Sequence, residues 1–229
     1  MTITMYDLAG ADPKRRFSPF CWRTRMALAH KELDVDAVPL RFGEKEKIAF
    51  SGQQLVPVIV DGDTVVTDSW KIAQYLEARY PERPSLFGDN ALVQIRFIQG
   101  WTDYVLHVGI GRALMADIPA VIDPSDVPYF RESREKRFGT TLEAISADRE
   151  QRLPEFRRSL QPIRVPLQDY PYLGGASPTY ADYIVFGAFQ WARCTSPFRF
   201  LAEEDPVLAW CKRIDGLFGG LARDVPAFY

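Results

Sequence analysis

The sequence predicts an N-terminal α/β domain followed by an all-helical domain. Residues 1–81 alternate between strand-like and helix-like hydrophobic patterns, whereas the long periodic segments after residue 90 are typical of helices, with no convincing strand between them. The chain has 229 residues, of which 47% are hydrophobic. Because a single core typically uses roughly 100–150 residues, this length favours two packed domains.

Charge and cysteine content exclude several classes of protein. The chain has 28 Lys and Arg against 30 Asp and Glu, a net charge of −2, whereas nucleic acids and anionic membranes attract clustered basic residues. No apolar run approaches the about 20 residues of a membrane span, and no signal-peptide pattern opens the chain. The three cysteines, Cys21, Cys194 and Cys211, are too scattered for a disulfide framework or a zinc site. We therefore expect a reduced cytoplasmic protein that holds no metal.

Strand and helix signals follow one another closely in the first domain. Pro19 stands at a first helical position, where its missing N–H costs nothing, and Asp61-Gly62 between two apolar runs predicts a hairpin. The predicted strands and helices lie at Ile3–Leu8, Pro19–Lys31, Val35–Leu40, 56–60, Thr64–Thr67 and Ile72–Tyr80. Residues 41–54 predict only a short helix or an irregular segment. The order is therefore βαβ, a short helical piece, then ββα.

The second domain begins after a linker. Pro81 ends the last helix of the first domain, and the turn-rich segment 82–89 predicts the linker. The helices predicted after it lie at 90–117, 128–150, 179–194 and 205–218. The second domain is thus expected to span residues 90–229.

Ser18 stands where the loop after the first strand meets the first helix. The free N–H groups and the dipole of a helix N-terminus stabilise an anion. A serine hydroxyl there can donate a hydrogen bond to a bound thiolate and lower the pKa of its thiol. The other interpretation is that Ser18 simply caps the helix. Cys21 lies a turn into the helix, where a thiol is usually buried and inert.

Two further motifs have both a structural and a functional interpretation. Pro57 opens a strand although proline cannot donate to the ladder. A cis Val56–Pro57 bond would turn the Val56 backbone outward to pair with an extended peptide, and a trans edge proline is the alternative. Asp68 and Ser69 can cap the next helix. Alternatively, that helix N-terminus can hold an α-carboxylate while Asp68 pairs with an α-ammonium.

These three motifs, in this order, resemble the glutathione-binding domain of the soluble glutathione S-transferases: Ser-Pro-Phe-Cys at 18–21, Val-Pro at 56–57 and Asp-Ser at 68–69. In the second half, Thr179 and Asp182 match the family's buried capping box. The Ser-Pro-Phe-x-Trp-Arg run is most similar to serine-type bacterial transferases related to the lignin β-aryl-ether-cleaving enzymes, and to their fungal relatives. The maleylacetoacetate-isomerase class shares Ser-x-x-Cys openings.

The resemblance implies a thioredoxin-like first domain that binds glutathione. Ser18 would hydrogen-bond the glutathione sulfur and stabilise its thiolate, and Val56, with Pro57 in cis, would pair through its backbone with the cysteinyl unit. Asp68 and Ser69 would hold the γ-glutamyl end. The thiolate would attack an electrophilic carbon, and catalysis would come from thiol activation and alignment of the two substrates.

Two assignments stay open within this resemblance. The glycine carboxylate of glutathione needs a basic or amide side chain after the second strand, and Gln54 is the favoured candidate among five: Arg41, Lys45, Lys47, Gln53 and Gln54. Tyr6 is the alternative thiol activator, because some transferases use a tyrosine at the end of their first strand. Ser18 already fills that role, and an aromatic residue in a strand more often packs.

The electrophile pocket is expected between the first helix and the early helices of the second domain. Its candidate lining is aromatic, which suits a flat aromatic substrate such as an aryl ether: Phe20, Trp22, Trp101, Tyr104 and His107. Phe20, so close to Ser18, would also border glutathione. The alternatives are a glutathione-dependent isomerase of a small diacid, with Arg23 and Arg112 as its basic groups, and a protein that binds hydrophobic ligands without catalysis. The resemblance also implies a homodimer that pairs the first domain of one subunit with the second domain of the other.

Overall fold

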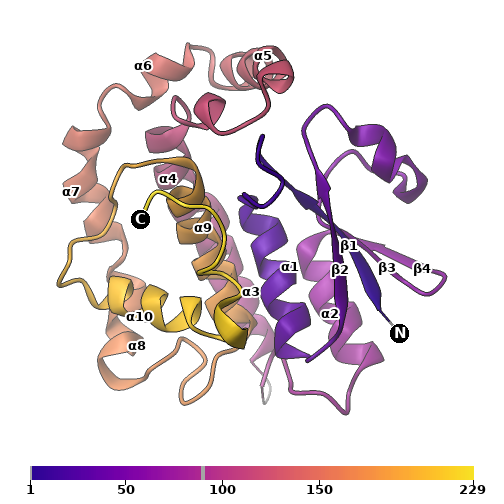
Figure 1. The fold of residues 1–229 in the computed structure, drawn as a ribbon. Helices are drawn as coiled ribbons and strands as arrows, with labels where there is room; N and C mark the ends of the chain where they lie inside the picture. Colours follow the sequence, from indigo (N-terminus) through magenta and orange to yellow (C-terminus); the bar gives the residue numbers. More distant parts are fainter. Residues whose placement is uncertain (1, 89–90) are drawn as a thin grey trace.

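The computed structural model describes residues 2–88 and 91–229 (Figure 1). Residue 89 of the predicted linker and residue 90, where the second domain was expected to begin, lie outside the described residues, as does Met1.

The first domain is built on one mixed four-stranded sheet. Its strands are β1 (Ile3–Leu8), β2 (Val35–Leu40), β3 (Val58–Asp61) and β4 (Thr64–Thr67). They lie in the order β2-β1-β3-β4, with β1 and β2 parallel and the other neighbours antiparallel. This topology confirms the predicted thioredoxin-like domain.

Alternate strand residues supply two different cores. Met5 and Ile59 point into the main hydrophobic core together with residues of the helices α1 (Pro19–His30) and α2 (Ser69–Arg79). The neighbouring Val58 faces the other way, into a small cluster with Ile48 of the 3-10 helix Lys45–Ser51. The period of two in a strand produces this division.

The second domain is helical, as predicted. Its helices are α3 (Leu92–Trp101), α4 (His107–Leu114), α5 (Val127–Phe138), α6 (Leu142–Ser146), α7 (Arg149–Ser159), α8 (Gln161–Asp169), α9 (Tyr180–Thr195) and α10 (Pro206–Asp215). A π-helical turn, Thr102–Leu106, joins α3 to α4. No helix in residues 2–88 and 91–229 is long and apolar enough to cross a membrane.

The structure corrects the helix boundaries in the middle of the second domain. The helix predicted at 128–150 ends at Gly139, which adopts a left-handed φ of 71° that favours glycine. The sequence predicted no helix in residues 151–178, but most of α7 and all of α8 lie there. Each contains an internal proline, Pro154 or Pro166, which removes a helical hydrogen bond and weakens the local signal.

Helix α9 packs the two domains together. Almost every residue of α9 is buried, and the helix lies along α1 (Figure 1). A Cβ on Gly187 would lie 2.5 Å from the backbone oxygen of Pro19, so the missing side chain lets α9 approach the first turn of α1. The position of Ser18, one residue earlier, therefore depends on the second domain.

The start of α9 is held by the predicted capping box. Asp182 is fully buried, and its carboxylate accepts hydrogen bonds from three backbone N–H groups and one indole. The donors are Leu173 N (2.8 Å), Thr179 N (2.9 Å), Gly174 N (3.0 Å) and Trp210 Nε1 (2.9 Å). This side chain joins the loop before α9 to α10.

The three cysteines are buried and free. Burial is the main cause that raises the pKa of each thiol, in Cys21, Cys194 and Cys211. Each thiol is therefore protonated near neutral pH, which agrees with the buried, inert thiol expected for Cys21.

Candidate functional site

The sheet register brings the three sequence motifs to one end of the first domain. Thr67, the last residue of β4, pairs with Val58 at the start of β3. Asp68-Ser69 and Val56-Pro57 therefore lie next to each other across this edge. Tyr6 of β1 also pairs with Val58, so the loop that leads from β1 to Ser18 leaves from the same end.

Ser18 is the N-cap of α1. Its Oγ accepts a hydrogen bond from Cys21 N (3.2 Å), and its hydroxyl proton is used by no hydrogen bond in the described part of the chain. The Cys21 thiol lies within reach of this hydroxyl, and burial raises the pKa of the thiol well above its usual value, so the competing acceptor is a neutral sulfur, which accepts only weakly. Ser18 therefore caps the helix and keeps its proton for a second partner.

Val56 presents an unused edge of backbone. The Val56–Pro57 bond is cis, as the functional interpretation predicted. Across residues 2–88 and 91–229, neither the N–H nor the C=O of Val56 takes part in a hydrogen bond. Both groups are therefore available to an extended peptide.

Asp68 and Ser69 form a polar helix start with free groups. Asp68 has a φ of 73°, in the left-handed region that non-glycine residues rarely adopt. Its Oδ1 accepts from Trp70 N (3.0 Å) and Lys71 N (3.1 Å). Asp68 Oδ2 and the Ser69 backbone N–H take no hydrogen bond among the described residues. A free carboxylate oxygen next to a helix N-terminus suits a ligand that carries both an ammonium and a carboxylate.

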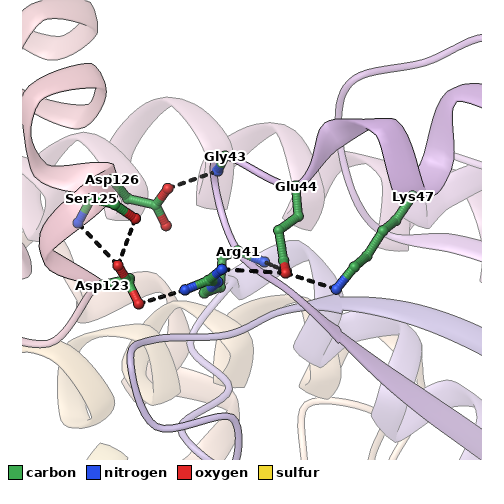
Figure 2. A network of polar contacts seen from close by, with 7 residues as sticks. All are labelled: Arg41, Gly43, Glu44, Lys47, Asp123, Ser125 and Asp126. Carbon is green, nitrogen blue, oxygen red and sulfur yellow. Dashed lines mark hydrogen bonds and ion pairs between the residues drawn. The ribbon is translucent and has the colours of Figure 1, made fainter.

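A polar network links the first domain to the segment before α5 (Figure 2). Arg41 lies between Glu44 and Asp123 and forms an ion pair with each. The backbone N–H of Gly43 donates to Asp126 Oδ1 at 2.8 Å. The Arg41 guanidinium thus already forms an interdomain ion pair with Asp123.

Of the five candidates for binding the glycine carboxylate, Gln54 differs from the others because its side chain has no partner among the described residues. Three others are also engaged: Lys45 with Tyr129 Oη (2.7 Å), Lys47 with Glu44 Oε1 (2.8 Å) and Gln53 with Thr67 Oγ1 (2.7 Å). Gln54 is exposed, and its side chain forms no hydrogen bond in the described residues. The contact of Gln53 with Thr67 brings the residue next to Gln54 against the strand end that precedes Asp68.

Phe20 and His107 are the two predicted pocket residues that the structure brings together. Their rings meet edge to face, with centroids 5.2 Å apart, and Phe20 remains 39% exposed. His107 Nδ1 lies 3.4 Å from Asp103 Oδ1, and the same oxygen is 2.6 Å from Arg23 Nη2. Burial, followed by the charge of Arg23, lowers the pKa of His107 to about 3. The imidazole is therefore neutral near pH 7.

Arg23 stacks on Phe20 at 4.8 Å, with its side chain fully buried. From the sequence, Arg23 is expected only as a basic group for a diacid, and its ion-pair partner Asp103 is not among the predicted residues. The spacing of Asp103 and His107, one helical turn apart, is the signal that could have found this pair.

The other predicted pocket residues lie elsewhere. Trp22 is fully buried and donates its indole N–H to Arg16 O at 2.9 Å, because α1 turns this residue toward the core. Trp101 packs against the main core. Tyr104 is 83% exposed and lines a cavity between α4 and α7. Of the five predicted pocket residues, Phe20 and His107 are thus the pair whose rings the structure places in contact.

Tyr6, the alternative activator, belongs to the small cluster on the face of the sheet that the 3-10 helix covers. Its ring packs on Phe50 with centroids 5.5 Å apart. This position fits a packing role, away from the first turn of α1.

Comparison with known proteins finds the same family in both halves of the chain. The model for the glutathione S-transferase N-terminal domain matches residues 14–84, and the model for the C-terminal domain of the same family matches residues 94–204. A zeta-class glutathione S-transferase of Euphorbia esula is 41% identical over 73 residues, which are 30% of this chain and 32% of that protein. The chain therefore matches about a third of the length of this curated relative.

Solved structures share the fold over nearly the whole chain. The glutathione transferase GSTFuA3 of Phanerochaete chrysosporium has a TM-score of 0.84 at 24% identity, covering 96% of this chain and 97% of that one. A glutathione S-transferase of Ceriporiopsis subvermispora, solved in complex with glutathione, has a TM-score of 0.80 at 22% identity, covering 96% and 97%.

Proposed function

Because this chain belongs to the glutathione S-transferase family, we propose that it transfers glutathione to a hydrophobic, aromatic electrophile and that Ser18 activates the thiol. The observation that carries the proposal is the hydroxyl proton of Ser18. It is unused within the described residues, at a helix N-terminus beside two other sets of unused polar groups. Those groups belong to Val56 and to the Asp68–Ser69 edge.

The free groups match the three parts of glutathione. The backbone of Val56 would pair with the cysteinyl unit, as in the addition of a strand to a sheet edge. The Ser69 N–H would hold the γ-glutamyl carboxylate, and Asp68 Oδ2 the ammonium. Gln54 would donate to the glycine carboxylate. Held in this way, the sulfur would lie near Ser18.

Bound glutathione would supply a thiolate that forms a carbon–sulfur bond with the electrophile and expels the leaving group with its electron pair. The Ser18 hydroxyl donates to the thiolate and lowers the pKa of the thiol. Phe20 and the neutral His107 offer an aromatic surface next to this position. In an aryl-ether substrate, the broken bond would be the ether C–O bond and the leaving group a phenolate.

The isomerase alternative needs accessible basic side chains near the sulfur. Arg23 is fully buried against Asp103, and Arg112 lines the cavity between α4 and α7. The hydroxyl donor of Ser18 favours catalysis over simple ligand storage. The geometry therefore supports thiol transfer above either alternative.

Steady-state assays with glutathione test the proposal. We expect turnover of a chlorodinitrobenzene, as a general electrophile, and of a model β-aryl ether, with little isomerisation of maleylacetoacetate. Fast isomerisation would favour the diacid alternative. Tight binding of aromatic ligands without turnover of any electrophile would favour the non-catalytic one.

Replacing Gln54 by alanine is expected to raise the Kd of glutathione about fivefold, because a hydrogen bond to a carboxylate contributes about 1 kcal/mol at an exposed site. Calorimetry of glutathione binding measures the change. Gln53→Ala is the matched control, since that amide is engaged with Thr67. Equal Kd values for Gln54→Ala and the parent protein would exclude this role.

We also propose that the protein is a homodimer that uses an exposed apolar patch on α3. Val93 and Phe97 lie one helical turn apart and are 77% and 75% exposed. Leu55, on the first domain, is 74% exposed. In a two-fold dimer, the patch on α3 would meet Leu55 of the other copy, which would cover both surfaces.

Phe97→Glu is expected to convert the dimer into a monomer, because it would place a charge in the apolar contact. Light scattering coupled to gel filtration measures the mass. Val165→Glu serves as the control, since Val165 is 52% exposed on α8. A Phe97→Glu protein that stays dimeric would place the interface elsewhere.

A further inference from the structure

The cavity that Tyr104 lines in the helical domain has the features of a ligand site. It has a volume of about 310 Å³ and lies between α4, α7 and residues 198–200. The lining residues that matter here are Tyr104, Gly109, Arg112, Arg152, Phe156 and Phe198. Ser18, Val56, Asp68 and His107 are not part of its lining. We call it the α4–α7 groove.

One of the lining arginines, Arg152, has a guanidinium nitrogen without a hydrogen-bond acceptor in the described residues. Arg152 Nη2 pairs with Asp148 Oδ1 (2.7 Å) and donates to Ile145 O (2.8 Å). Its Nη1 is buried without a hydrogen-bond partner in the part of the chain that the structure describes. A buried donor without a partner is costly and rare, so a turn of the side chain that brings Nη1 into the groove would let it donate to an acceptor on a ligand.

A second arginine adds positive charge to the same place. Arg112 is exposed and forms no ion pair within residues 2–88 and 91–229. Burial and the charge of Arg112 lower the pKa of Arg152 despite the nearby Asp148. The acidic lining residue Glu155 is exposed, which leaves its carboxylate hydrated. An anion between the two arginines would relieve their repulsion.

The groove also has aromatic lining residues, Phe156 on α7 and Phe198. The Phe156 ring packs directly on α4, where a Cβ on Gly109 would come within 2.6 Å of it. Phe156 and Phe198 each contact Phe200 edge to face, with centroids 5.2 and 5.0 Å apart. Arg149 lies over the Phe198 ring at 4.9 Å, so the half-buried Phe156 is the ring that a flat aromatic ligand can contact.

We propose that the α4–α7 groove binds a flat aromatic carboxylate, separately from the glutathione site. Arg112 and Arg152 hold the carboxylate, and Phe156 contacts the aromatic ring. The cavity volume is of the size that small-molecule sites have, roughly 300–1,000 Å³. The proposal does not depend on the catalytic role of Ser18.

Calorimetry with naphthoate as the probe tests the site in the intact protein. S-hexylglutathione is added in excess to occupy the glutathione and electrophile sites. We expect naphthoate to bind with the same Kd with and without it, and neutral naphthol to bind about tenfold more weakly because it lacks the charge-assisted hydrogen bonds. Displacement of naphthoate by S-hexylglutathione would overturn the proposal, since it would place the probe at the other site.

Arginine variants test whether naphthoate binds in the groove or is attracted by positive charge anywhere on the surface. Arg152→Gln and Arg112→Gln are each expected to raise the Kd of naphthoate about tenfold, with glutathione binding unchanged. Arg158→Gln is the control, because Arg158 is exposed on the same helix α7 but does not line the groove. Equal naphthoate affinity in all three variants would contradict the proposal. Glutathione binding in the same samples shows that each variant is folded.

Discussion

Ser18→Ala is expected to lower kcat/KM with glutathione and a chlorodinitrobenzene about ten- to hundredfold, because a hydrogen bond to a charged group contributes about 1.5–3 kcal/mol. The backbone of Val56 and the Asp68–Ser69 edge are untouched by this change. The Kd of glutathione should therefore rise no more than a few-fold. Steady-state kinetics and calorimetry together separate loss of activation from loss of binding.

The cap function of Ser18 requires its own control. The Oγ of Ser18 accepts from Cys21 N, so alanine also removes a helix cap, which costs about 1 kcal/mol of stability. Ser18→Asp keeps a good cap but offers only acceptors and places a negative charge beside the sulfur. We expect Ser18→Asp to fold as stably as the parent protein and to be at least as inactive as Ser18→Ala. An active Ser18→Asp protein would mean that the residue is only a cap.

Asp182→Ala is expected to lower the free energy of unfolding by roughly 3–4 kcal/mol, because it leaves buried donors without an acceptor. The carboxylate is fully buried and accepts four hydrogen bonds, including one from the Trp210 indole. Its loss would loosen the start of α9, where the Tyr180 hydroxyl donates to Ser69 O at 2.7 Å. Urea unfolding followed by circular dichroism measures the change.

The matched control for this change is Asp169→Ala. Asp169 is exposed at the end of α8 and forms no hydrogen bond or ion pair within the described residues. We expect its replacement to change the free energy of unfolding by less than about 0.5 kcal/mol. If Asp182→Ala were equally mild, the buried network would not be a main source of stability in the second domain.

Local signals in the sequence were enough to predict the first domain. Ser18 and Pro19 occupy the N-cap and first turn of α1, where the chemistry of serine and proline favours a helix start. The turn at Asp61-Gly62 closes the β3–β4 hairpin as expected. Each of these signals acts over a few residues and so can be seen without the fold.

Helices α7 and α8 could not be predicted in the same way. None of the described residues of α7 is fully buried, so it lacks the apolar stripe that marks an amphipathic helix. Pro154 interrupts the same pattern from within. What stabilises the helix is packing against distant parts of the chain, such as Phe156 on Phe200, which no local pattern contains.

In the candidate site, too, features that depend on a few neighbouring residues could be predicted, whereas contacts between distant residues could not. The motifs at Ser18, Val56 and Asp68 were found in sequence, and the sheet register explains why they share one edge. The partner of Arg41, Asp123, lies 82 residues away, so sequence could not show that this side chain was already engaged. Likewise, periodicity alone could not show that α1 exposes Phe20 and buries Trp22.

The most direct test of the central claim is a pH titration of the thiolate absorbance of glutathione bound to the parent protein and to Ser18→Ala. We predict that the thiol pKa in the parent complex lies well below about 8.5, the value of a free cysteine thiol. In the Ser18→Ala complex it should return close to that value while glutathione stays bound. Identical thiol pKa values in the two complexes would contradict the role assigned to Ser18.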